Sequence, residues 1–159
     1  MNRRSFLYTT FFISNITNAD YISLHHDEFL VIDSVLEHMF DATDIVPRYK
    51  DTDMIKFVAW SIFHPSYDIE IREFVLAGAR ELLVNYKDFL KSNKFQKEIY
   101  LRRFEDIRMG QSWLYRIQIL GMEAIYSAPV YGVNHQCRYY GFIDAKAGEP
   151  MPKCRYIEI

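Results

Sequence analysis

One segment of this 159-residue chain constrains its fold more than any other, because its apolar side chains occupy two neighbouring faces of one helix. Within residues 111–127, the two stripes consist of Trp113, Ile117, Leu120 and Ala124, and of Tyr115, Ile119, Met122 and Tyr126. A helix that is apolar over most of its circumference has to be covered on more than one side. That cover comes either from the other helices of a closed bundle or in part from a second chain.

Four earlier segments have the apolar spacing of amphipathic helices, at residues 23–40, 52–63, 71–89 and 94–107. Their inward-facing positions are expected to be Phe29, Ile32, Leu36 and Met39; Met54, Phe57, Val58 and Phe63; Ile71, Val75, Leu82, Tyr86 and Phe89; and Phe95, Ile99, Tyr100 and Phe104. The predicted fold class is therefore all-α, with about five helices in an irregular bundle and a non-helical C-terminal arm.

Small and polar residues predict where these helices end and where they meet. Asn93, with Gln96 three residues later, resembles a capping box at the start of the fourth helix. Pro65 ends the second helix, because the residue before a proline disfavours helical geometry. Gly110 precedes the fifth helix, and Gly78 lies where a neighbouring helix can approach the third one closely.

Composition narrows the class of protein. The formal net charge of -2 gives no general attraction for nucleic acid. No run of 18 apolar residues occurs, so we expect no membrane-spanning helix. The 12 tyrosines, 12 phenylalanines and 2 tryptophans exceed what the core of a small helical monomer needs, which is compatible with a protein partner.

Residues 1–19 have the pattern of an export signal. Arg3 and Arg4 are their only charged residues and precede a short apolar stretch that begins with Phe6 and Leu7. The order Arg-Arg-Ser-Phe-Leu resembles the twin-arginine signal, whose machinery exports proteins that are already folded. The alternative is an ordinary basic N-terminus. Excluding this segment leaves a helical domain at residues 20–128.

Residues 129–159 form a different kind of segment, broken by glycine and proline but rich in aromatic residues. We expect an ordered arm that docks on a partner, because a solvated tail would not retain so many rings. The two cysteines of the chain, Cys137 and Cys154, both lie here. In an exported protein they pair within the chain, pair with a partner chain, or remain free thiols.

No motif for catalysis is present, since the chain has no nucleophile elbow, phosphate-binding loop or dinucleotide fingerprint. His38 and Asp41 have helical spacing and form at most half of a metal site. We expect no catalytic, cofactor-binding or metal-binding residue on this chain, which favours a subunit over an enzyme. Two alternatives stay open: a free-standing exported enzyme or small-ligand or metal binder that uses His38 and Asp41, and a cytoplasmic helical adaptor.

Several motifs together resemble one family. The turn at residues 129–134 reads Pro-Val-Tyr-Gly-Val-Asn, an aromatic–glycine segment follows at 139–142, and a Gly/Pro-rich end lies at 148–152. With the Arg-Arg-Ser-Phe-Leu start, these resemble the gluconate 2-dehydrogenase subunit 3 family over residues 3–7 and about 25–152. Two features depart from the family pattern: Val133 replaces the second glycine of the turn, and residues 137–139 replace a Gly-Trp pair.

The resemblance implies a non-catalytic small subunit of a periplasmic dehydrogenase complex that is peripheral to the inner membrane. Its partners would be a large subunit that holds FAD and oxidises a sugar acid, sugar or polyol, a c-type cytochrome subunit that holds haem, and the twin-arginine export machinery. The small subunit would support export and maturation of the large one. The residues expected at the interface with the partner are Trp113, Tyr115, Tyr126, Pro129, Tyr131, Gly132, Asn134, Tyr139 and Tyr140.

Overall fold

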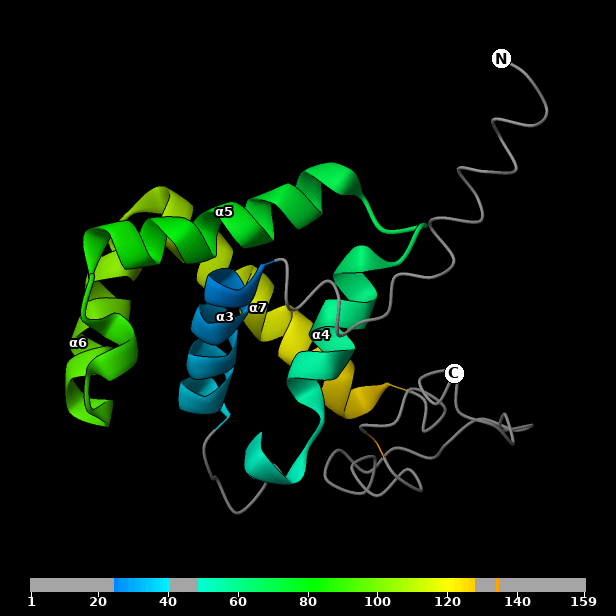
Figure 1. The fold of residues 1–159 in the computed structure, drawn as a ribbon, viewed down its shortest axis with the longest axis horizontal. Helices are drawn as coiled ribbons and strands as arrows, with labels where there is room; N and C mark the ends of the chain where they lie inside the picture. The colour runs from blue at the N-terminus through cyan, green and yellow to red at the C-terminus, as the bar shows by residue number, and fades with distance from the viewer. Residues whose placement is uncertain (1–24, 41–48, 128–133, 135–159) are drawn as a thin grey trace.

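A computed structural model describes residues 25–40, 49–127 and 134 of the chain (Figure 1). Within these residues the structure is all-helical and contains no strand, which confirms the predicted all-α class and its five α-helices. Apart from Asn134, the predicted C-terminal arm at residues 129–159 lies outside the described residues. Two short 3-10 helices, η1 (Tyr49–Asp51) and η2 (Phe89–Lys91), accompany the α-helices. The α-helices are α3 (His26–Met39), α4 (Met54–Phe63), α5 (Ile69–Asn85), α6 (Lys94–Glu105) and α7 (Arg108–Tyr126).

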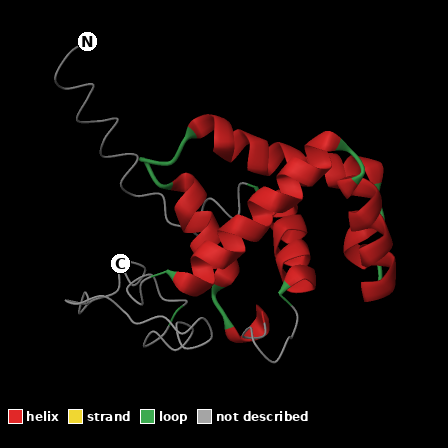
Figure 2. Ribbon diagram, turned by 180° about the vertical axis from the view of Figure 1, so that it is seen from behind, coloured by secondary structure: helices red, strands yellow, loops and turns green. Residues whose placement is uncertain are grey.

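Helix α7 lies at the centre of the bundle and contacts α3, α4, α5 and α6. It crosses behind the other helices in Figure 1 and comes to the front in Figure 2, which is drawn from the opposite side. Its first stripe is buried completely or almost so, and consists of Trp113, Ile117, Leu120 and Ala124. This chain therefore covers one face of its two-sided helix by itself.

The second stripe of α7 is only partly covered. Ile119 and Tyr126 are half-buried, whereas Met122 and Tyr115 are exposed, Tyr115 to 64%. Of the two sources of cover that the sequence left open, the chain's own bundle accounts for the first stripe and for part of the second.

Side-chain caps mark the starts of α5 and α6. The Asp68 carboxylate accepts hydrogen bonds from the backbone N–H groups of Glu70 and Ile71, at 2.7 and 3.2 Å. The Asn93 side chain accepts one from the N–H of Gln96 at 2.9 Å, as the capping motif predicts. Helix α4 ends at the residue before His64, which adopts extended geometry ahead of Pro65.

Helices α5 and α7 approach each other closely at Gly78. A Cβ atom built at this glycine would overlap the ring of Trp113. The indole N–H of Trp113 donates a hydrogen bond to the Val75 carbonyl oxygen at 2.8 Å, so its one polar atom has a partner inside the core. The ring of Phe104 meets the same indole edge-on, with 5.9 Å between ring centroids.

Several expectations about individual positions were wrong. Gly110 does not precede α7 but lies buried within it, where a Cβ atom would overlap the backbone of Phe104. The third helix ends at Asn85, so Phe89 reaches the core from η2. Phe95 near the start of α6 is 75% exposed and Met39 at the end of α3 is 37% exposed, so neither belongs to the buried core.

No helix among the described residues is long and apolar enough to cross a membrane.

We predict that Gly78→Ala destabilises the fold by about 1–3 kcal/mol, because the added methyl group overpacks the contact with Trp113. Alanine has the higher intrinsic helix propensity by about 1 kcal/mol, so a loss of stability isolates the clash. Urea unfolding measures the effect. Val84→Ala, at an exposed position of the same helix, is the control and should leave stability within about 0.5 kcal/mol of wild type. A Gly78→Ala protein as stable as wild type would contradict this account of the helix crossing.

Candidate functional site

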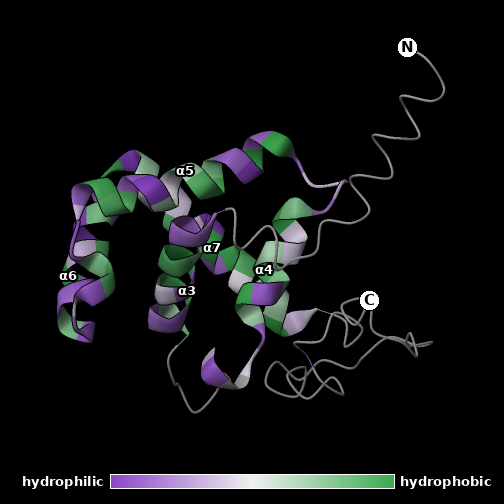
Figure 3. Cartoon of the chain, in the orientation of Figure 1, coloured by the Kyte–Doolittle hydropathy of each residue, from purple (hydrophilic) through white to green (hydrophobic). Residues whose placement is uncertain are grey.

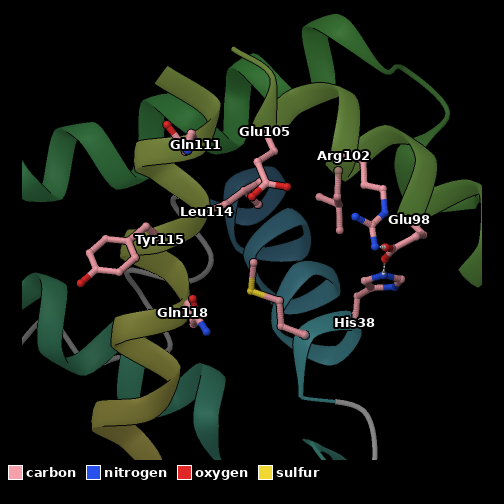
Figure 4. Close-up of a pocket in the computed structure, with 10 residues that line it drawn as sticks. His38, Glu98, Arg102, Glu105, Gln111, Leu114, Tyr115 and Gln118 are labelled. Carbon is pink, nitrogen blue, oxygen red and sulfur yellow. Dashed lines mark hydrogen bonds and ion pairs between the residues drawn. The ribbon is translucent and has the colours of Figure 1, made fainter. Parts of the chain in front are cut away.

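A groove of about 510 Å³ lies between α6 and α7, with the end of α3 at its base (Figure 4). Its apolar lining comes from Met39, Leu101 and Leu114. The remaining lining residues are polar or charged: His38, Glu98, Arg102, Glu105, Gln111, Tyr115 and Gln118. A second hollow, of about 370 Å³, lies on the other side of Tyr115, between α5 and α7.

Three side chains form a polar network at the α3 side of the groove. His38 Nε2 donates to the Glu98 carboxylate at 2.6 Å, and the other oxygen of that carboxylate lies 2.6 Å from the Arg102 guanidinium. The hydrogen bond from His38 is the main cause that lowers the pKa of Glu98. The charge of Arg102 acts in the same direction, while partial burial opposes both.

A second polar contact joins the same two helices. The Lys97 ammonium donates to the hydroxyl of Ser34 at 2.7 Å and lies over the Phe89 ring, 5.8 Å from its centroid. Helix α6 is hydrophilic around much of its surface (Figure 3), and only its Leu101 and Phe104 are buried. Its attachment to α3 therefore depends on polar contacts more than that of the other helices does.

On the opposite side of α3, Tyr49 of η1 donates a hydrogen bond from its hydroxyl to the Asp33 carboxylate. Burial is the main cause that raises the pKa of Tyr49, and the hydrogen bond to Asp33 raises it further. The phenol therefore stays protonated and acts as a donor. This contact holds η1 against α3 and gives no sign of a reaction centre.

The residues that the sequence assigned to a partner interface have different environments. Trp113 is fully buried among α5, α6 and α7, so its assignment to the interface was wrong; it is a core residue. Tyr126 is half-buried against the core, and Tyr115 is exposed. Asn134 is buried, and its amide donates to the carbonyl oxygen of Ser127, the residue after α7, at 3.0 Å.

The other predicted site residues lie outside the described residues. They are Arg3, Arg4, Phe6 and Leu7 of the export signal; Pro129, Tyr131, Gly132, Tyr139 and Tyr140 of the arm; and Cys137 and Cys154. Asp41, the proposed partner of His38, also lies outside them. Among the described residues, no group of three or more histidine, cysteine, aspartate or glutamate side chains is arranged to hold a metal ion.

Sequence reasoning did not find Glu98, Arg102 and Glu105 as lining residues of one groove. The pairing of Glu98 with Arg102 was readable locally, since oppositely charged residues four positions apart on a helix are neighbours. Its link to His38 was not, because 60 residues separate the two in sequence.

Comparison with known proteins gives no relative: no family model, curated protein or solved structure matches this chain.

We predict that Glu98→Gln lowers the melting temperature by no more than a few degrees, and that this effect is complete only above the ordinary carboxyl pKa of 4.5. Because folding lowers the pKa of Glu98, its stabilising effect is complete above that value and is lost as the pH falls through the lower pKa of the folded state. Melting curves from pH 3 to pH 7 test this. Glu105→Gln, on the same helix but without an ion pair among the described residues, is the control and should show no such dependence. A temperature difference that is the same at every pH would contradict the prediction.

Proposed function

We propose that this chain is the non-catalytic small subunit of a periplasmic flavoprotein dehydrogenase of the gluconate 2-dehydrogenase type. It binds the FAD-containing large subunit and supports its export and maturation. The complex is peripheral to the inner membrane, and a c-type cytochrome subunit accepts its electrons. The identity of the partner rests on the turn at residues 129–134, the arm that follows it, and the Arg3-Arg4 signal.

The observation that best supports a docking role is the position of Tyr115. Its ring is 64% exposed and lies on α7 between two hollows, one shared with α3 and α6 and the other with α5. Tyrosine is one of the residues that most often dominate binding energy, because its large rigid ring ends in a polar group. A partner can therefore bury the protruding Tyr115 ring and insert its own side chains into the hollow on each side of that ring.

A physical rationale connects docking with export. A large subunit that folds around FAD in the cytoplasm needs a route that carries folded proteins. If that subunit has no signal of its own, Arg3 and Arg4 of this chain direct both proteins to the twin-arginine machinery. The two subunits must then associate before export, which places the interface on surfaces that are folded in the cytoplasm.

We predict that Tyr115→Ala weakens binding to the large subunit by about tenfold or more, as truncation of a central interface aromatic does. The affinity-tagged full chain is purified from its native host, and the co-purifying protein is assayed for FAD fluorescence, haem absorbance and dye-linked oxidation of gluconate. Phe95→Ala is the matched control, because Phe95 is an aromatic residue outside both hollows that is even more exposed than Tyr115, 75% against 64%. A chain that purifies without a flavoprotein, or that itself holds FAD, would overturn the proposal.

We predict that the double change Arg3→Lys and Arg4→Lys abolishes export of this chain and leaves the large subunit in the cytoplasm. The charge is unchanged, so only a machinery that recognises the arginine pair responds. Cell fractionation followed by immunoblotting of both subunits is the measurement. Asn2→Lys adds a positive charge beside the intact pair and is the control, with normal export expected. Unchanged export of the double variant would exclude twin-arginine transport.

A further inference from the structure

We propose that the groove between α6 and α7 receives a basic side chain, lysine or arginine, from the partner protein, and that Glu105 pairs with its charge. The inference rests on the proposed docking function, since the groove is bordered by Tyr115. It adds the chemistry that the partner must present at this place.

Glu105 is the acidic group of the groove that remains available. Glu98 is already engaged by both His38 and Arg102, each at 2.6 Å. Arg102, three residues before Glu105 on α6, is held to Glu98 on the side of the network near α3. Within the described part of the chain, the Glu105 carboxylate forms neither a hydrogen bond nor an ion pair. A cation that enters the groove therefore meets one carboxylate without displacing an existing partner.

The remaining lining suits the rest of such a side chain. Leu101, Leu114 and Met39 provide an apolar floor for an aliphatic stem, as lysine and arginine stems commonly pack on apolar surface. Figure 4 shows the Glu105 side chain reaching from α6 toward the groove, and Gln111 of α7 also lines the groove. The amide oxygen of Gln111 can accept a further hydrogen bond from an ammonium or guanidinium group.

The composition of the groove favours a protein segment over a free small molecule. Small-molecule sites are enclosed and mostly apolar, with few polar groups. Here seven of the ten lining residues are polar or charged, and only three are apolar. A small apolar centre with a polar border is instead typical of the rim and core of a protein–protein interface.

The test uses the isotope-labelled full chain and two peptide probes, acetyl-Leu-Lys-Leu-amide and its uncharged counterpart in which norleucine replaces lysine. The lysine peptide should shift the backbone NMR signals of Leu101, Leu114 and Gln118, with millimolar affinity. The norleucine peptide should bind at least fivefold more weakly, because it lacks the charge. Glu105→Gln should weaken the lysine peptide by a similar factor, since it removes the charge-assisted contact.

Glu73→Gln, which removes an exposed carboxylate of α5 outside the groove, is the control and should leave the affinity unchanged. Equal binding of both peptides, equal binding to the Glu105→Gln protein, or shifts confined to other surfaces would overturn the proposal. Putrescine binding as tightly as the lysine peptide would assign the groove to small cations and would also overturn it. Because no flavoprotein is present, the result is independent of whether the large subunit is correctly identified.

Discussion

The contact of Trp113 with α5 determines how the other helices of this bundle are placed. The indole lies against Gly78, donates to the carbonyl oxygen of Val75 and receives the edge of Phe104. These three contacts bring α5 and α6 to adjacent sides of α7 and fix its rotation about its own axis. Once that rotation is set, the stripe that contains Trp113 faces the core and Tyr115 must face outward, because residues two positions apart on a helix point to different sides.

The sequence predicted those parts of the fold that depend on neighbouring residues, and it failed where contacts between helices decide the structure. Apolar spacing identified the five helices, and Asn93 and Pro65 located two of their ends correctly, because caps and breakers act through neighbouring residues. The prediction that Gly110 precedes the fifth helix was wrong, because a glycine at a close backbone contact and a glycine at a helix boundary cannot be told apart from sequence. The prediction that Phe95 faces inward was wrong, because apolar periodicity identifies the apolar face of a helix but not how far the neighbouring helices extend along that face.

The residues of the candidate site were harder to predict from sequence, because their environments also depend on contacts between helices. Trp113 and Tyr115 were both plausible interface aromatics, and only the packing of α5 against α7 separates the buried one from the exposed one. His38 has an acidic residue nearby in sequence, yet its partner is Glu98 on another helix. The groove is a tertiary feature, since its lining comes from three helices whose mutual positions no local pattern encodes.

Helix α6 connects these observations to the proposed role. It joins α3 through the His38–Glu98 and Lys97–Ser34 contacts, and it buries only two of its side chains. A helix that buries few apolar side chains opens at lower free energy than one held by a packed core. The α7 side of the groove is rigid by contrast, because Trp113 and Ile117 are buried directly behind it. A partner side chain that enters between the two therefore meets Tyr115 on α7 and Glu105 on α6.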